Sequence, residues 1–144
     1  MKWVKQSIHY WCPDTKEQKF LGQNVTVAIL DTGISPHPDF KGRILSFRDF
    51  SSTTGSSEKV LFSFSHFSPL IDNSGHGTHV AGILAGSGLL SSGTYAGIAP
   101  FCNLIIGKVL DQNGNGSIKN VINGIQWIRD IYTQFHIRII NISV

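Results

Sequence analysis

Residues 25–33 read VTVAILDTG, a short and nearly continuous apolar run that ends on a carboxylate and a glycine. A run of this kind, rich in β-branched side chains, is typical of a strand buried on both faces of a parallel sheet. Gly22 and Gln23 precede it and favour a turn. We therefore expect a central strand over residues 24–30, with Asp31 at its carboxyl end.

Other apolar stretches predict the rest of the sheet. Residues 103–110 and 137–144 each favour a strand, and residues 43–47 favour an edge-like strand. Residues 51–57 are rich in Ser, Thr and Gly and predict an exposed loop. The partial alternation at residues 61–65 indicates either a short strand or a loop anchored by aromatic side chains.

A first helix is predicted over residues 75–86, with Asn73 or Ser74 as its N-cap. Gly82 and Gly86 lie four residues apart and therefore on one face of this helix. Each glycine weakens a helix by about 1 kcal/mol relative to alanine. We expect the close approach of another backbone to explain them, and the helix to be buried.

A second helix is predicted from Ser117, its N-cap, to about Tyr132, after a turn at Gly114 and Gly116. Its apolar face is expected to consist of residues at helical spacing. These are Ile118, Val121, Ile122, Ile125, Ile128, Ile131 and Tyr132.

Strands that alternate with helices predict an α/β fold of three layers, in which a mostly parallel sheet carries helices on both faces. Residues 22–144 are expected to form this body, and residues 1–21 an N-terminal arm that packs onto it. The last predicted strand, residues 137–144, ends the chain. We therefore expect the sheet to be incomplete at the C-terminus, with exposed apolar surface that favours association.

Composition limits the class of protein. With 144 residues, 41% of them hydrophobic and 15% charged, the chain is expected to form one globular unit. The net charge of +3 is scattered, so no nucleic-acid partner is indicated. Neither a signal peptide nor a membrane span is evident, which predicts a cytoplasmic protein if Met1 is the true start. Cys12 and Cys102 are expected to be free, buried thiols.

Asp31 is the first candidate for chemistry, because active sites of open α/β sheets gather at the carboxyl ends of the strands. Two interpretations stay open from the residues alone. The carboxylate either serves an active site or only caps the turn that follows. Asp31-Thr32-Gly33 also has the form found in aspartic proteases, which would require a second such motif or a dimer.

His76 is the second candidate, at the start of the predicted glycine-rich helix. The positive end of the helix dipole favours a neutral imidazole, which can accept a proton. Gly75 and Gly77 on either side are expected to leave room for a substrate backbone. The alternatives are an ordinary surface histidine or a metal pair with His79, for which a third ligand and the HExxH pattern are missing.

Together these two segments, VTVAILDTGISPHPDF at residues 25–40 and SGHGTHVAGILAG at 74–86, resemble the Asp and His blocks of the subtilisin-like serine proteases, the subtilases of peptidase family S8. The resemblance covers most of residues 22–144. It continues through residues 96–100, 107–110, 123–127 and 140–143. The family implies a serine-type endopeptidase with a triad in the order Asp, His, Ser.

The resemblance also implies roles for individual residues. Asp31 would orient and charge-stabilise His76, and His76 would take a proton from a serine and deliver it to the leaving amine. Gly114-Asn115-Gly116 matches the segment that pairs an extended polypeptide substrate as an added strand. Ser143 matches the start of the segment that lines the other side of the cleft.

Two blocks of the family are absent from these 144 residues: the one with the nucleophilic serine and the one with the oxyanion-hole asparagine. Ser87 does not replace the serine, because helical rise places it about 16 Å from His76. We therefore expect residues 1–144 alone to be inactive. The alternative to an enzyme is a non-catalytic remnant. Such a remnant would bind either an extended peptide or the polypeptide that completes the fold, which is a C-terminal segment or a second chain.

No cofactor is required by this interpretation. Asp39 matches a calcium ligand in some relatives, but the Gly- and Ser-rich residues 87–95 do not resemble the loop that supplies the other ligands. The sequence leaves a calcium site at Asp39 open. Residues 51–69 differ from the shorter connection expected in the family and are interpreted as an insertion.

Overall fold

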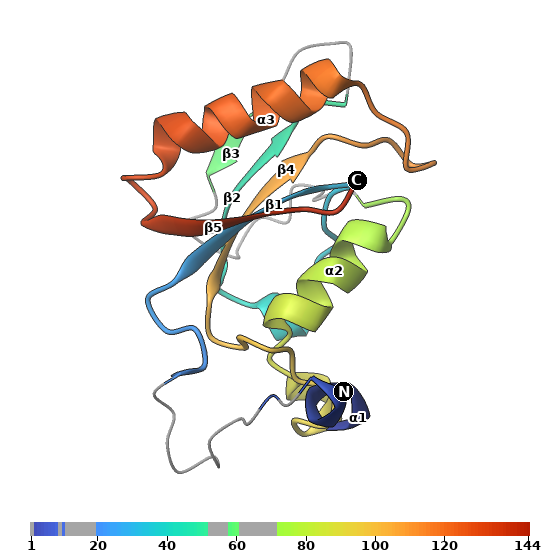
Figure 1. Ribbon diagram of the computed structural model, residues 1–144, viewed down its shortest axis with the longest axis vertical. Helices are drawn as coiled ribbons and strands as arrows, with labels where there is room; N and C mark the ends of the chain where they lie inside the picture. Colours follow the sequence, from blue (N-terminus) through green and yellow to red (C-terminus); the bar gives the residue numbers. More distant parts are fainter. Residues whose placement is uncertain (1, 9, 11–19, 52–57, 61–71) are drawn as a thin grey trace.

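The computed structural model describes residues 2–8, 10, 20–51, 58–60 and 72–144. They contain one five-stranded sheet with the order β3-β2-β4-β1-β5 (Figure 1). The strands are β1 (Thr26–Asp31), β2 (Ile44–Asp49), β3 (Glu58–Val60), β4 (Asn103–Lys108) and β5 (Ile137–Ile142). β1 pairs in parallel with β4 and β5, β2 pairs in parallel with β4, and β3 runs antiparallel to β2.

Two helices cover opposite faces of this sheet, α2 (His76–Ala85) and α3 (Ile118–Ile131) (Figure 1). Successive side chains of a strand point to opposite faces. In β1, Val27 and Ile29 pack in the cluster that contains residues of α2, whereas Ala28 and Leu30 pack in the cluster that contains residues of α3. The predicted three-layer α/β fold with a mostly parallel sheet is therefore confirmed.

The sheet differs from the sequence prediction at one side. β2 is not an edge strand, because β3 pairs with it through Ser46, Phe47 and Arg48. β3 was not predicted, since it is short, contains the charged residues Glu58 and Lys59, and follows a Ser- and Gly-rich stretch. The loop prediction for residues 51–57 and the prediction for residues 61–65 fall almost wholly outside the described residues.

Helix α2 is buried on one face only, at Gly77, Ala81 and Ala85. The expectation of a buried helix therefore holds for this face and not for the opposite one. A Cβ added to Gly82 would meet nothing within 4 Å, so Gly82 does not itself need to be small. The close approach comes from Gly97, at which a Cβ would lie 2.8 Å from the carbonyl oxygen of Gly82.

Helix α3 begins as predicted, because the hydroxyl of Ser117 accepts the N–H of Asn120 at 3.1 Å. Its buried face only partly matches the predicted one. Trp127 and Gly124 are buried, and a Cβ on Gly124 would lie 3.0 Å from Leu30. Ile128 and Ile131 are buried as predicted. The remaining members except Val121 are exposed, namely Ile118, Ile122, Ile125 and Tyr132.

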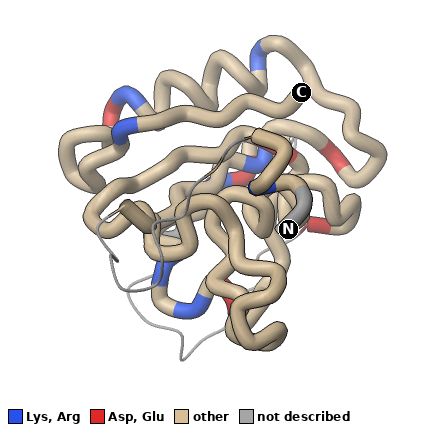
Figure 2. Tube along the Cα trace, turned by 60° about the horizontal axis from the view of Figure 1, so that its bottom comes forward, with Lys and Arg blue, Asp and Glu red and all other residues tan. Residues whose placement is uncertain are grey.

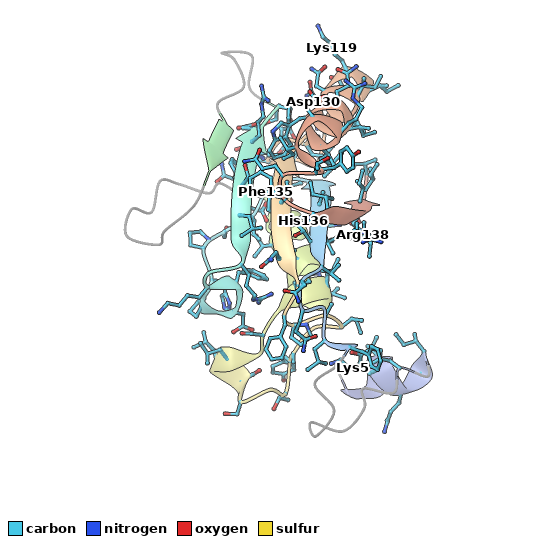
Figure 3. The ribbon with its side chains drawn as sticks, turned by 90° about the vertical axis from the view of Figure 1, so that its left-hand side faces the viewer. Lys5, Lys119, Asp130, Phe135, His136 and Arg138 are labelled. Carbon is cyan, nitrogen blue, oxygen red and sulfur yellow. The ribbon has the colours of Figure 1, made fainter. Side chains whose placement is uncertain are left out.

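The shorter helices are α1 (Lys2–Ser7), η2 (Pro38–Phe40) and η3 (Leu89–Ser91). Next to α1, the ammonium of Lys5 donates to the carbonyl of Gly97 at 2.9 Å, and the hydroxyl of Tyr10 donates to the carbonyl of Ile98 at 2.6 Å. Figure 3 shows Lys5 at the opposite end of the molecule from α3. The division into an arm of residues 1–21 and a body of residues 22–144 stays a prediction.

Charged side chains are dispersed over the elements, without a continuous stripe of one sign along the described trace (Figure 2). None of the described helices is long and apolar enough to cross a membrane. Cys102 is buried and free, as predicted, and burial raises the pKa of its thiol. Cys12 lies outside the described residues.

Candidate active site

Asp31 is the last residue of β1 and is completely buried. Its Oδ1 accepts the N–H of Thr32 at 2.6 Å and lies 2.8 Å from Nδ1 of His76. Its Oδ2 is buried and has no hydrogen-bond partner within the described ranges. The Oδ1 atom thus faces two N–H groups, one from the backbone of Thr32 and one from the His76 ring.

His76 is the first residue of α2, and its side chain is 53% exposed. The structure thus brings the two predicted residues together across 45 positions of sequence. With Nδ1–H donating to Asp31, the neutral ring has its acceptor at Nε2. The pair therefore offers a base whose tautomer is set by a buried carboxylate.

The pKa of His76 lies above its ordinary value of 6.5. The hydrogen bond that the ring donates to Asp31 is the main cause, followed by the charge of Asp31; the charge of Asp72 raises the pKa further. The expectation that the helix dipole would favour the neutral ring is therefore wrong, because Asp31 favours the protonated ring more strongly. A full carboxylate charge in direct contact outweighs the partial charge of a helix end.

The N-terminus of α2 is not capped by Asn73 or Ser74. The carboxylate of Asp72 accepts the N–H groups of Gly75 and Thr78, at 2.9 and 2.8 Å. Sequence reasoning missed Asp72, although an acidic residue just before a predicted helix is a recognised signal for a helix start. Burial raises its pKa, but hydrogen bonds from Thr78, Thr32 and Gly75 outweigh this and hold it below the ordinary value.

The glycines on either side of His76 have different functions. Gly75 is the N-cap residue and has φ 83°, a left-handed conformation that favours glycine. Gly77 is buried against β1, where an added Cβ would collide with the carbonyl oxygen of Gly33 and lie 3.2 Å from Oδ1 of Asp31. The expectation that Gly77 leaves room for substrate is therefore wrong: it leaves room for the backbone of Gly33, just after β1.

A cavity of about 340 Å³ lies beside His76. Two of the predicted substrate-binding residues, Gly114 and Ser143, line it, whereas Asn115 and Gly116 do not. The other lining residues are Thr32, Ser74, Leu110, Asn113 and Val144. The cavity is thus formed where β1, β4 and β5 end, which is the expected edge of a parallel sheet.

Asn115 and Gly116 instead shape the turn that carries Gly114. Asp111 accepts the N–H of Asn115 at 2.9 Å and donates its own N–H to the carbonyl of Asn115 at 2.7 Å. Gly114 has φ 78°, and a Cβ on Gly116 would lie 2.6 Å from the carbonyl oxygen of Val109. These contacts hold the turn at the mouth of the cavity.

Lys108 lies beneath this edge and was not predicted as a site residue. It is the register partner of Asp31 in β4 and is only 6% exposed. Its ammonium donates to the carbonyl oxygens of Thr32 and Leu110, at 2.5 and 2.8 Å. Since both residues line the cavity, Lys108 connects two of its walls.

Asp39 does not fit a calcium site. Its Oδ2 accepts the N–H of Gly88 at 2.9 Å, and its Oδ1 accepts the N–H of Leu90 at 3.3 Å. Calcium requires several oxygen ligands, but here the loop presents amide donors to the carboxylate. For His76 and His79, no group of three or more metal-ligating side chains is found in the described part of the chain.

Comparison with known proteins agrees with the resemblance found in the sequence. The family model described as "Subtilase family" matches residues 22–144. The chain belongs to the subtilase family. The match begins at the turn before β1 and includes both Asp31 and His76.

Among subtilases of known sequence, the chain is 46% identical over 110 residues to serine protease AprX of Bacillus subtilis (strain 168), with 76% of this chain and 22% of AprX covered. It is 41% identical over 108 residues to the major intracellular serine protease of the same strain, with 74% of this chain and 30% of that protein covered. The chain thus spans less than a third of the length of these relatives.

Solved subtilase structures share the fold. The Clostridium perfringens CspB protease matches with a TM-score of 0.74 and 27% identity, over 89% of this chain and 30% of that one. Sphericase matches with a TM-score of 0.71 and 29% identity, over 85% of this chain and 37% of that one.

Proposed function

We propose that Asp31 and His76 are two members of the Asp-His-Ser triad of a serine endopeptidase. The observation that carries this is the 2.8 Å contact between Oδ1 of Asp31 and Nδ1 of His76 beside a cavity at the sheet edge. In the reaction, Nε2 of His76 takes the proton of a serine hydroxyl while the serine oxygen attacks the peptide carbonyl. Asp31 stabilises the imidazolium, which then gives the proton to the leaving amine.

The substrate in this proposal is a polypeptide in an extended conformation. Residues 112–119 are exposed, and Gly114 lies at the mouth of the cavity that His76 lines. An extended peptide beside this segment could form main-chain hydrogen bonds as an added strand. Ser143 on the opposite wall would then contact the substrate from the other side.

We propose that neither Ser143 nor Ser87 is the triad serine. The hydroxyl of Ser143 donates to the side chain of Asn141 at 2.8 Å, and that of Ser87 accepts the N–H of Leu89 beyond the far end of α2. We therefore propose that residues 1–144 alone do not hydrolyse peptides. Loss of the triad serine lowers kcat about a million-fold.

A second function is supported by the exposed apolar side chains of α3 and β5. They comprise Ile118, Ile122, Ile125 and Tyr132 on α3, and Ile139, Ile140, Ile142 and Val144 on and after β5. β5 pairs only with β1 in the described sheet, so its other edge is available for a further strand. This surface would bind the polypeptide that completes the sheet, whether or not that polypeptide supplies the triad serine.

A chimeric enzyme tests the first function. Residues 22–144 replace the matching part of subtilisin E of Bacillus subtilis, to which the chain is 40% identical over 116 residues. We expect the chimera to cleave a fluorogenic peptide, and His76→Ala to lower kcat about a million-fold. His79→Ala, on the same helix, is the matched control. A folded chimera that keeps its activity with His76→Ala would disprove the assignment.

The isolated chain tests the remaining claims. Purified residues 1–144 are expected to show no turnover of the same peptide. Turnover that His76→Ala abolishes would contradict the proposed inactivity. Self-association that Ile122→Glu and Ile139→Glu suppress would support the exposed surface as a binding site, and a strictly monomeric chain that binds no apolar dye would contradict it.

A further inference from the structure

We propose that Asp72 is a positioning residue for the reacting pair: its carboxylate locks the start of α2 onto the end of β1 and thereby holds the His76 ring against Asp31. This inference rests on the function proposed for Asp31 and His76. It concerns a residue that lies outside the pair.

Both oxygens of the Asp72 carboxylate are occupied. Oδ1 accepts the hydroxyl of Thr32 at 2.8 Å and the N–H of Gly75 at 2.9 Å. Oδ2 accepts the N–H and the hydroxyl of Thr78, at 2.8 and 2.5 Å. Asp72 is 9% exposed, so these bonds are shielded from water. Bonds to an ionised and buried acceptor are among the stronger ones in proteins.

Thr32 extends this network to both members of the pair. Its N–H donates to Oδ1 of Asp31 at 2.6 Å, while its hydroxyl accepts the N–H of Gly77 at 2.9 Å. Thr32 follows Asp31 directly, and Gly75 and Gly77 are the two neighbours of His76. The backbone on both sides of His76 is thus bonded to the Asp72–Thr32 unit.

The His76 ring itself has little else to hold it. It is more than half exposed, and among the described residues its side chain is hydrogen-bonded to Asp31. A single hydrogen bond from a half-exposed ring to another element is easily loosened unless the backbones of the two elements are fixed relative to each other. Small errors in the position of a catalytic group can lower rates about a hundred-fold. Asp72 supplies the fixation that the pair cannot supply alone.

Asp72 could act on His76 by positioning it or through its charge alone, and the charged groups around His76 show which substitutions distinguish the two effects. Asp31 from β1 and Asp72 before α2 are the acidic groups that raise its pKa. Lys108 from β4 is directed to the carbonyl oxygens of Thr32 and Leu110, and His79 lies one turn along α2. Asp72→Asn removes the charge and the bonds accepted by one of the two oxygens, because an amide nitrogen cannot accept. Thr32→Val removes only the bonds through the hydroxyl.

The test is an NMR titration of the histidine rings in the full 144-residue chain, with detection of the Nδ1 proton that His76 shares with Asp31. We expect Asp72→Asn to shift the His76 titration midpoint to lower pH. Thr32→Val is expected to weaken or abolish the Nδ1 proton signal through faster exchange with water, and Thr32→Ser to retain it. Asp39→Asn is the matched control, because Asp39 accepts two amide N–H groups in the loop that contains η3.

Asp31→Asn distinguishes this inference from the proposed function. If Asp31→Asn leaves the His76 titration midpoint unchanged, the proposed function of Asp31 and His76 as an interacting pair is wrong. If Asp31→Asn lowers it but Asp72→Asn and Thr32→Val leave both midpoint and Nδ1 signal unchanged, only the role of Asp72 is wrong. Should Asp72→Asn fail to fold, the comparison of the Nδ1 proton signal in Thr32→Val and Thr32→Ser tests the role of Asp72 instead. An effect of Asp39→Asn equal to that of Asp72→Asn would also overturn the inference.

Discussion

Gly77 is packed directly against the carbonyl of Gly33, with no space for a Cβ between them. The two glycines follow His76 and Asp31 at distances of one and two residues in sequence. Their contact lets the first turn of α2 lie on the end of β1, so that the imidazole reaches the buried carboxylate. The absence of a side chain at Gly77 is therefore a condition for the 2.8 Å contact between Asp31 and His76.

Gly77→Ala should separate α2 from β1. We expect a loss of about 1–3 kcal/mol in the free energy of unfolding, typical of an overpacked site, and loss of the Asp31–His76 contact. Urea unfolding and the Nδ1 proton signal of His76 measure the two effects. Gly82→Ala is the control: it lies in the same helix with open space around it, and is expected to stabilise by up to about 1 kcal/mol. Equal effects of the two substitutions would contradict this explanation.

The raised pKa of His76 predicts the pH dependence of an active enzyme that carries this site. A protonated ring cannot accept the serine proton, so activity should rise with pH, with a midpoint above 6.5. Asp31→Asn should move the midpoint down. The Asp31–His76 interaction should stabilise the fold fully below pH 6.5 and lose this contribution as pH rises through the raised pKa. A pH–rate profile with its midpoint below 6.5 would be incompatible with the geometry.

Asp72 predicts a loss of stability in acid. Its pKa is lowered from 3.8, so its contribution is present above pH 3.8 and is lost as pH falls through the lower folded value. Urea midpoints of the unsubstituted chain should therefore drop as the pH falls below 3.8, and Asp72→Asn should flatten this dependence. A variant whose midpoints follow the original curve would show that Asp72 is not the responsible carboxylate.

Lys108→Met should destabilise the sheet edge. It leaves the buried carbonyl oxygens of Thr32 and Leu110 without their donor, and each lost partner costs about 1–3 kcal/mol. Urea unfolding measures the loss. Lys119→Met is the control, since Lys119 is exposed on α3 and points away from the sheet (Figure 3). If both variants unfold at the same urea concentration, the two bonds of Lys108 contribute nothing net.

Calcium is predicted not to stabilise the chain through Asp39, because both carboxylate oxygens already accept amide N–H groups. Thermal unfolding with millimolar calcium or with a chelator should give the same Tm. Asp39→Asn should lower Tm in both conditions alike. A calcium-dependent rise in Tm that Asp39→Asn abolishes would show that the loop rearranges to bind the ion.

The elements with strong local patterns could be predicted from sequence. The apolar run of β1, the Ser117 cap of α3 and the strands β4 and β5 depend on neighbouring residues, so the chain carries their signal locally. Asp31 and His76 could be identified for a related reason: each stands in a long segment that resembles a block of the subtilase family. Their spacing in sequence, however, does not give the distance between their side chains in the folded chain.

The remaining features depend on how separate elements pack. α3 carries two adjoining apolar stripes, and only the sheet shows that Trp127 and Ile128 face it while Ile118 and Ile122 do not. Asp72 looks like any polar residue before a helix until Thr32, 40 positions away, donates to it. Sequence by itself determined where β1, β4, β5 and α3 form and which two residues are proposed to carry the chemistry, because those inferences depend on local patterns. The tertiary structure decided what holds the two residues together, because that depends on contacts between distant segments.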